Sequence, residues 1–411
     1  MDPTTLSTVA LIAAVATIAP LLSEASGRKV PSVVLELVAG IIIGPQVLAL
    51  AVETPTVRSL AGFGLCFLFF MAGYEIEFAE IRGRPLDLAA IGWLVSLLVA
   101  AAVAGVLLVT GFTISELLIA LALTTTALGT LLPMLADADI LHTRFGAYIL
   151  AIGGAGEFLP VVAIALFFSG DSPYEETLLL LLFIALATGA VAMAIRPTPP
   201  RVVELLGRTV DSSSQLPIRI AVLLIALLVW VASELGLDVL LGAFAAGVVA
   251  RLANQGEQAH VIEQKLSGVA FGVFVPIFFV VSGMGLDIDS FRERPLTLLR
   301  VPLFLALFLL VRGIPVLLLY RRDVHRSQLF PLALLSATAL PIVVAITEIG
   351  VDSGHMRPAN AAALVGAAIL SVLVFPSTAF GWMRRHPVPP DAEVAAPADE
   401  PTEVYEDEAD I

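Results

Sequence analysis

Long apolar runs recur along almost the whole chain, and this pattern limits what the chain can fold into. A membrane-spanning helix needs about 20 consecutive apolar residues. The sequence predicts thirteen such spans, several with internal Gly or Pro: 5–22, 31–49, 57–73, 86–110, 114–136, 144–169, 176–195, 216–235, 238–252, 265–285, 297–319, 327–349 and 358–383. Only 14% of the residues are charged, whereas a soluble protein has about 25%. We therefore expect an all-α polytopic membrane protein.

The basic residues are divided unevenly between the two sides that thirteen spans define. Most fall on the side of the C-terminus, among them Arg84, Arg144, Arg321 and Arg322. The positive-inside rule makes that side cytoplasmic. We expect a multi-pass protein of the cell (inner) membrane, with its N-terminus outside and its C-terminus in the cytoplasm. Residues 387–411 are acidic and rich in Pro and Ala, which predicts a disordered cytoplasmic tail.

An internal repeat links the two halves of the chain. Residues 69–85 and 279–295 share Phe, Gly and an Arg-x-Arg-Pro ending at a constant offset of 210 positions. The two copies would comprise helices one to six and helices eight to thirteen. Equivalent helices are then an odd number of spans apart, so the copies have opposite orientations in the membrane. Inverted six-helix repeats are typical of secondary transporters, whose sites lie at the midplane between the copies.

Two repeat-related spans carry helix-breaking residues in their middle. The first, 114–136, contains the run LALTTTALGTLLPML, and the second, 327–349, contains LALLSATALPIVVAI. Non-helical backbone at membrane depth is tolerated where it is buried in protein or lines a cavity. We expect two discontinuous helices that cross, with Thr125, Thr126, Ser336 and Thr338 at the crossing as oxygen ligands for a cation. The alternative is an ordinary proline kink whose hydroxyls bond to the preceding turn.

Glu157 lies in the middle of the span 144–169, in the stretch AIGGAGEFLP. A carboxylate at the bilayer centre is costly, about 2.5–3.5 kcal/mol on insertion scales, and indicates a functional site. Its neighbour Gly156 allows close approach of another backbone. Pro160 lacks an N–H and frees a carbonyl one turn earlier. We expect Glu157 to bind a proton and a small cation in turn.

Arg312 lies near the middle of the span 297–319, and a buried guanidinium requires an anion or free carbonyl groups. Two interpretations remain open. Arg312 could form a static ion pair with Glu157, or it could bind the carbonyl groups at a half-helix end when a cation or proton occupies Glu157.

Other polar residues are weaker candidates. Glu36, within PSVVLELVAGIIIGP, could face a cavity or a dimer partner, and Glu348 could guide cations at the outer end of its span. The single cysteine excludes a thiolate metal cluster, and the histidines fall in loops or at helix ends. We expect no metal site, no cofactor and no nucleic-acid partner.

The chain resembles the cation:proton antiporter superfamily, in the branch of bacterial sodium/proton and potassium/proton exchangers. The matching segments are VPSVVLELVAGIIIGPQVL, LFFMAGYEIEF, LTTTALGTLLPMLAD, GAFAAGVVARL and VPIFFVVSGMGLDI. The resemblance implies thirteen helices, a homodimer that forms through a scaffold domain, and a six-helix core that moves by alternating access. It also implies that Thr125 and Thr126 belong to the first crossing, that Glu157 is the ion-binding carboxylate, and that Arg312 is its basic partner.

The resemblance suggests an organisation of the chain. Scaffold and dimer helices would occupy 1–85 and 210–296, and core helices would occupy 86–170 and 297–386, with 171–200 as a linking helix. The chain departs from family members that move net charge, which carry two adjacent acids and a Lys where this sequence has Gly156-Glu157 and Arg312.

We expect a secondary active transporter, not an enzyme. With one titratable carboxylate and an Arg that does not release its proton, exchange of one cation for one proton is the simplest cycle. The transporter would exchange a monovalent cation, K⁺ or Na⁺, for protons by alternating access, without moving net charge. The alternatives are an organic-anion symporter with the same crossed helices and a non-transporting membrane sensor.

Overall fold

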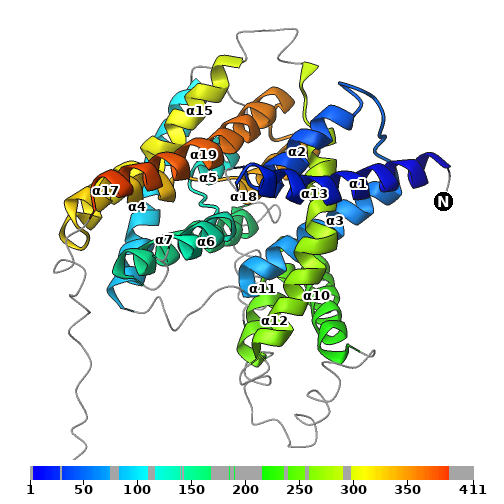
Figure 1. The fold of residues 1–411 in the computed structure, drawn as a ribbon, viewed down its shortest axis with the longest axis horizontal. Coiled ribbons are helices and arrows are strands. Elements are labelled where there is room, and N and C mark those ends of the chain that lie inside the picture. Colours follow the sequence, from blue (N-terminus) through cyan, green and yellow to red (C-terminus); the bar gives the residue numbers. More distant parts are fainter. Residues whose placement is uncertain are drawn as a thin grey trace, which may run out of the picture.

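The computed structural model describes residues 3–27, 30–74, 83–109, 116–138, 140, 143–167, 185, 189, 215–235, 239–254, 259–289 and 298–387. Every regular element within these ranges is a helix (Figure 1). Nine helices in this part of the chain are long and apolar enough to cross a membrane, and three shorter apolar segments accompany them, Ser32–Ile43, Leu117–Leu132 and Val239–Ala253. The all-helical membrane fold is confirmed. The predicted linking helix and the acidic tail fall largely outside the described residues, so the count of thirteen stays a prediction.

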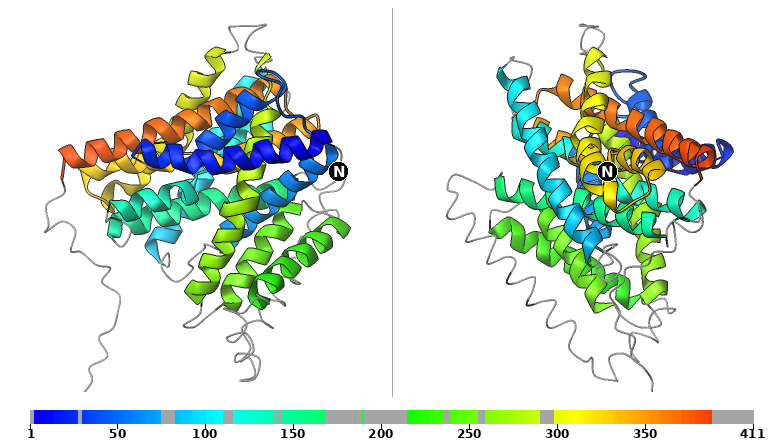
Figure 2. Two further views of the ribbon diagram at one scale, coloured as in Figure 1. Left: turned by 45° about the vertical axis from the view of Figure 1, so that its right-hand side comes forward. Right: turned by 90° about the vertical axis from the view of Figure 1, so that its left-hand side faces the viewer.

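One set of helices, here called the close-packed group, lies on the right of Figure 1. It consists of α1 (Pro3–Ala25), α2 (Ser32–Ile43), α3 (Pro55–Tyr74), α10 (Leu216–Glu234), α11 (Val239–Ala253), α12 (Ala259–Val269), the π-helical turn η1 (Ala270–Phe274) and α13 (Val275–Met284). The rotated views in Figure 2 show α10, α11 and α12 side by side at one end of the molecule.

Glycines allow the helices of this group to touch backbone to backbone. A Cβ atom added to Gly73 on α3 would lie 2.2 Å from the carbonyl oxygen of Phe244 on α11, and one added to Gly247 would lie 1.9 Å from that of Phe70. The pair α2 and α13 meets in the same way, through Gly40 and Gly283. Small residues at such positions are how membrane helices gain van der Waals contact, since lipid provides no hydrophobic drive between them.

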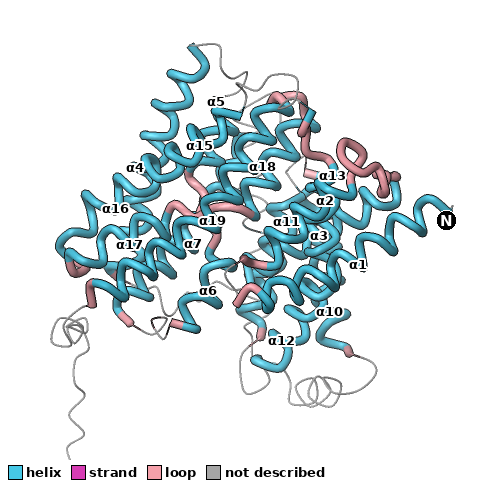
Figure 3. Tube along the Cα trace, turned by 45° about the horizontal axis from the view of Figure 1, so that its top comes forward, coloured by secondary structure: helices cyan, strands magenta, loops and turns pink. Residues whose placement is uncertain are grey.

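The remaining helices form a second set, here called the crossed-helix group. It consists of α4 (Arg84–Val109), α5 (Glu116–Leu123), α6 (Leu128–Asp137), α7 (Arg144–Phe167), α15 (Arg300–Phe308), η3 (Leu309–Gly313), α16 (Ile314–Leu319), η4 (Tyr320–Arg322), α17 (Arg326–Ser336), α18 (Pro341–Asp352) and α19 (Pro358–Arg385). Breaks at 124–127 and 337–340 separate α5 from α6 and α17 from α18 (Figure 3). Both broken helices were predicted from the sequence.

Two of the described membrane helices contain a π-helical turn, and each turn is followed by a proline. The turn η1 ends two residues before Pro276, and η3 ends two residues before Pro315. A proline cannot donate to the carbonyl four residues earlier and clashes with it. A wider turn accommodates that clash without ending the helix. Arg312 lies within η3, so this local widening sets the direction of its side chain.

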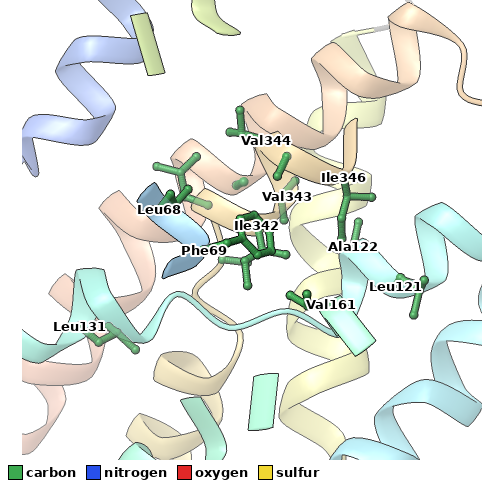
Figure 4. Close-up of a cluster of buried hydrophobic side chains, with 14 of the residues drawn as sticks. Leu68, Phe69, Leu121, Ala122, Leu131, Val161, Ile342, Val343, Val344 and Ile346 are labelled. Carbon is green, nitrogen blue, oxygen red and sulfur yellow. The ribbon is translucent and has the colours of Figure 1, made fainter. Parts of the chain in front are cut away.

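Buried apolar side chains fill the space beside the two breaks (Figure 4). They come from α3, α5, α6, α7 and α18, and include Leu68, Phe69, Leu121, Ala122, Leu131, Val161, Ile342, Val343, Val344 and Ile346. The two groups also meet where Phe158 of α7 stacks on Phe244 of α11, with ring centroids 5.0 Å apart.

A buried carboxylate at one end of the crossed-helix group ties three helices together. Asp323 follows η4, and its side chain is only 3% exposed. It forms a two-pronged ion pair with Arg84 at the start of α4 and accepts a hydrogen bond of 3.3 Å from the hydroxyl of Tyr148 on α7. The Arg84 guanidinium holds the pKa of Asp323 below its usual value, with a further contribution from Tyr148.

We predict that Gly73→Ala destabilises the protein, by about 1–3 kcal/mol, because the new methyl group would overlap the α11 backbone. Gly62→Ala on the same helix is the matched control, since a Cβ there meets no atom within 4 Å. Thermal unfolding in detergent should show a lower Tm for the first variant only. Equal melting temperatures would contradict the backbone contact.

We also predict a pH-dependent cost of Asp323→Asn. The pKa of Asp323 is lowered in the folded state, so its stabilising effect is present above the unfolded pKa, about 3.9. That effect is lost as the pH falls through the folded pKa. The Tm difference between wild type and variant should therefore be present at pH 7 and shrink below about pH 4. Tyr148→Phe, which removes one hydrogen bond, should show a smaller difference, and a pH-independent gap for Asp323→Asn would contradict the assignment.

Candidate functional site

The two breaks meet and satisfy each other's backbone groups. The amide of Ala127 donates to the carbonyl of Thr338 at 2.8 Å, and the hydroxyl of Thr126 donates to the carbonyl of Ser336 at 2.7 Å. Ser371 of α19 supports the second break, because its hydroxyl lies 3.0 Å from both the amide and the carbonyl of Ala339. Buried backbone groups must be paired within the protein when no water is at hand.

Glu157 lies against the first break. The amide of Thr126 donates to the carbonyl of Gly156 at 3.2 Å, and the amide of Gly129 donates to Oε1 of Glu157 at 3.3 Å. Gly129 is in the first turn of α6. The carboxylate therefore lies at the N-terminal end of a half-helix, where the exposed amides and the helix dipole stabilise negative charge.

Arg312 is directed at the opposite kind of helix end. Its side chain is buried, with the residue 4% exposed. Nε and Nη2 donate to Thr126 Oγ1 at 3.1 and 2.8 Å, Nε reaches the carbonyl of Ser336 at 3.3 Å, and Nη2 reaches that of Ile152 at 3.1 Å. Ser336 is the last residue of α17. Of the two sequence interpretations, this conformation matches a guanidinium bound to the carbonyl end of a half-helix.

Gly156 cannot carry a side chain in this arrangement. A Cβ atom there would lie 2.6 Å from Thr126 Oγ1 and 3.0 Å from Arg312 Nη2. The guanidinium and the threonine thus fill the space that a second acid would need. This explains in steric terms why glycine, and not another carboxylate, precedes Glu157.

The hydroxyl groups at the crossing differ in what they can still bind. Thr126 Oγ1 donates one hydrogen bond and accepts two from Arg312, which uses both of its lone pairs. In this conformation Thr126 therefore holds Arg312 and does not act as the cation ligand that the sequence predicted. The hydroxyls of Thr125 and Thr338 donate to the carbonyls of Ala122 and Leu334 in the preceding turn. These bonds use the hydroxyl protons and not the lone pairs of the hydroxyl oxygens. Ser336 donates to Ala333.

A cavity of about 570 Å³ reaches Glu157. It extends from the first turn of α6 and the start of α18 to the end of α1 and the start of α2. Two carboxylates, Glu24 and Glu157, are among its lining residues, and most of the others are apolar. Glu157 therefore lines a cavity that extends to the residues on either side of the α1–α2 connection.

The two weaker sequence candidates lie elsewhere. Glu348 of α18 accepts a hydrogen bond of 2.9 Å from Ser282 of α13, beside a separate cavity of about 200 Å³. Glu36 is buried on α2 at 3% exposure, one turn beyond Ser32 and Val33, which line the larger cavity.

Several contributors to the site were not predicted from the sequence. Ser96 of α4 lies 3.5 Å from Arg312 Nη1, and the carbonyl of Ile152, Gly129 and Ser371 complete the set. A serine within an apolar span was the available signal for Ser96 and Ser371. The Ile152 carbonyl and the Gly129 amide are backbone groups, so no residue type marks them.

A family model and two named relatives of this chain all describe exchangers or antiporters of cations and protons. Residues 11–385 match the family model described as "Sodium/hydrogen exchanger, transmembrane". The chain is 28% identical over 398 residues to the putative Na⁺/H⁺ antiporter YjbQ of Bacillus subtilis, covering 92% of this chain and 63% of YjbQ. It is 26% identical to the Na⁺/H⁺-K⁺ antiporter GerN of Bacillus cereus, covering 84% of this chain and 88% of GerN.

The fold is also similar to a solved structure. The sodium proton antiporter MjNhaP1 of Methanocaldococcus jannaschii superposes with a TM-score of 0.64 at 16% sequence identity, covering 93% of this chain and 99% of that one. At this identity the likeness concerns the fold alone.

We predict that Gly156→Ala disturbs the site, because its methyl group would displace Thr126 or Arg312. The expected loss of stability is about 1–3 kcal/mol. Gly154→Ala, on the same helix, is the matched control, since a Cβ there meets nothing within 4 Å. Thermal unfolding of both variants tests this, and a wild-type Tm for Gly156→Ala would contradict the packing described.

Proposed function

The chain belongs to the sodium/hydrogen exchanger family, and from this premise we propose that it is a secondary active transporter that exchanges a monovalent cation for protons. Glu157 is the residue that binds both. The names of the relatives support Na⁺ and K⁺ as the cations to test first.

One observation carries the proposal: a carboxylate in the middle of a membrane helix lines a cavity at the N-terminal end of a broken helix. Such a position stabilises the ionised form through nearby amides, while the apolar surroundings penalise a bare charge. A cation or a proton relieves that penalty. The hydroxyl oxygens of Thr125 and Thr338 at the breaks use their protons on the preceding turn, so their lone pairs supply the oxygen ligands that a partly dehydrated cation needs.

The contacts of Arg312 support an exchange that moves no net charge. Its donors are directed to Thr126, Ser336 and Ile152, and a guanidinium does not release its proton. Arg312 thus offsets the carbonyl end of α17 throughout the cycle. One carboxylate that binds either one cation or one proton then gives a one-for-one exchange.

The arrangement of cavities supports an inward-open state. The larger cavity reaches the α1–α2 connection, which the positive-inside rule assigns to the cytoplasm together with the C-terminus. On the opposite side, the hydrogen bond from Ser282 to Glu348 joins the close-packed group to the crossed-helix group. We infer that the close-packed group is the scaffold, through which a homodimer forms, and that the crossed-helix group moves against it.

We predict that Glu157→Gln abolishes cation-dependent proton movement in proteoliposomes, to the level of empty vesicles. The amide keeps the size of the side chain but cannot alternate between a proton and a cation. Glu234→Gln is the control, because it makes the same chemical change at the end of α10, a helix that contributes no residue to the cavity lining, and it should retain cation–proton exchange. A screen of Na⁺, K⁺, Li⁺ and Rb⁺ with the wild type identifies the cation.

Continued exchange by folded Glu157→Gln would overturn the assignment of this residue. Transport of carboxylated solutes, with no response to any monovalent cation, would favour an organic-anion symporter instead.

A further inference from the structure

Pro160 lies inside α7, three residues after Glu157. A helical residue normally donates its N–H to the carbonyl four residues earlier, and proline has no N–H to give. The carbonyl of Gly156 therefore lacks its intrahelical donor. Both Gly156 and Pro160 are buried, so water does not replace that donor.

The first break supplies the missing donor. Within it, the amides of Thr124 and Thr125 still bond to Leu121 and Ala122 of α5, three residues back. The amide of Thr126 is the next along the chain, and it bonds across to the Gly156 carbonyl at 3.2 Å. A carbonyl that lost its donor to a proline thus meets an amide that lost its acceptor to a helix break.

This bond fixes the peptide unit that directly precedes Glu157. The neighbouring bond, from the Gly129 amide to Glu157 Oε1, joins the same two segments. The backbone of Gly156 and the carboxylate of Glu157 are consequently held by amides three residues apart on the first broken helix.

We propose that Pro160 is a positioning residue for cation binding. By leaving the Gly156 carbonyl to Thr126, it sets the distance between the Glu157 carboxylate and the first turn of α6. This inference rests on the function proposed above, because Glu157 is the residue it positions. A proline that merely bends α7 would not require a buried amide from another helix to complete its freed carbonyl.

The test is Pro160→Ala in the full-length protein. Alanine restores an N–H that competes with Thr126 for the Gly156 carbonyl. We expect the KM for the transported cation to rise roughly two- to tenfold, the range that corresponds to one neutral hydrogen bond. The Tm should stay unchanged or increase, because the helical hydrogen bond is regained. Hydrogen–deuterium exchange of the peptide containing residues 124–127 should become faster.

Pro376→Ala is the matched control, since Pro376 also lies inside a helix of the crossed-helix group, in α19. Pro376→Ala should change neither the KM for the cation nor the hydrogen–deuterium exchange of the peptide containing residues 124–127. An unchanged KM for Pro160→Ala, with or without a lower maximal rate, would overturn the positioning role. Unchanged hydrogen–deuterium exchange at 124–127 would overturn the structural basis, and this readout holds even if the wild type transports no cation. If the wild type exchanged no cation for protons, that result would instead refute the proposed function.

Discussion

Two helices that stop in the middle of a membrane leave backbone amides and carbonyls that the hydrocarbon cannot bind, and the rest of the site depends on how these groups are paired. The amides of Thr126 and Ala127 bond across to Gly156 and Thr338. The carbonyl of Ser336 receives Arg312, and the amide of Gly129 reaches Glu157. The same set of contacts therefore pairs the backbone groups of the breaks and compensates the charges of Arg312 and Glu157.

The two charged side chains differ in what surrounds them. Arg312 is enclosed by hydroxyl and carbonyl oxygens and lies within a π-helical turn, so its environment is complete within the protein. Glu157 shares its surroundings with a cavity. In the proposed cycle this asymmetry assigns the constant charge to the guanidinium and the exchangeable one to the carboxylate. Thr126 and Arg312 occupy the space that a side chain at position 156 would need, so a second acid has no room there.

Much of this arrangement could be predicted from local sequence. A Thr-rich segment with Gly129 and Pro133 predicted the first broken helix, and Ser336, Thr338 and Pro341 predicted the second. Glu157 and Arg312, each in an apolar span, predicted the two buried charges. Local sequence also indicated a carbonyl freed by Pro160. It could not predict the acceptors of Arg312, because Thr126 and Ile152 are more than 150 positions away along the chain. The π-helical turn at Arg312 escaped prediction as well, since a proline in an apolar run is equally compatible with a simple kink.

The glycine contacts of α3 and α11 have a mechanical consequence for the whole molecule. Where two backbones touch with no side chains between them, shifting one helix against the other would force backbone atoms together, so we expect α3 and α11 to move as one unit. In the proposed cycle, movement between the two groups would instead occur where the rings of Phe158 and Phe244 separate the backbones of α7 and α11. Phe158 follows Glu157 directly, so in the proposed cycle the helix that carries this carboxylate lies at the surface along which the two groups move.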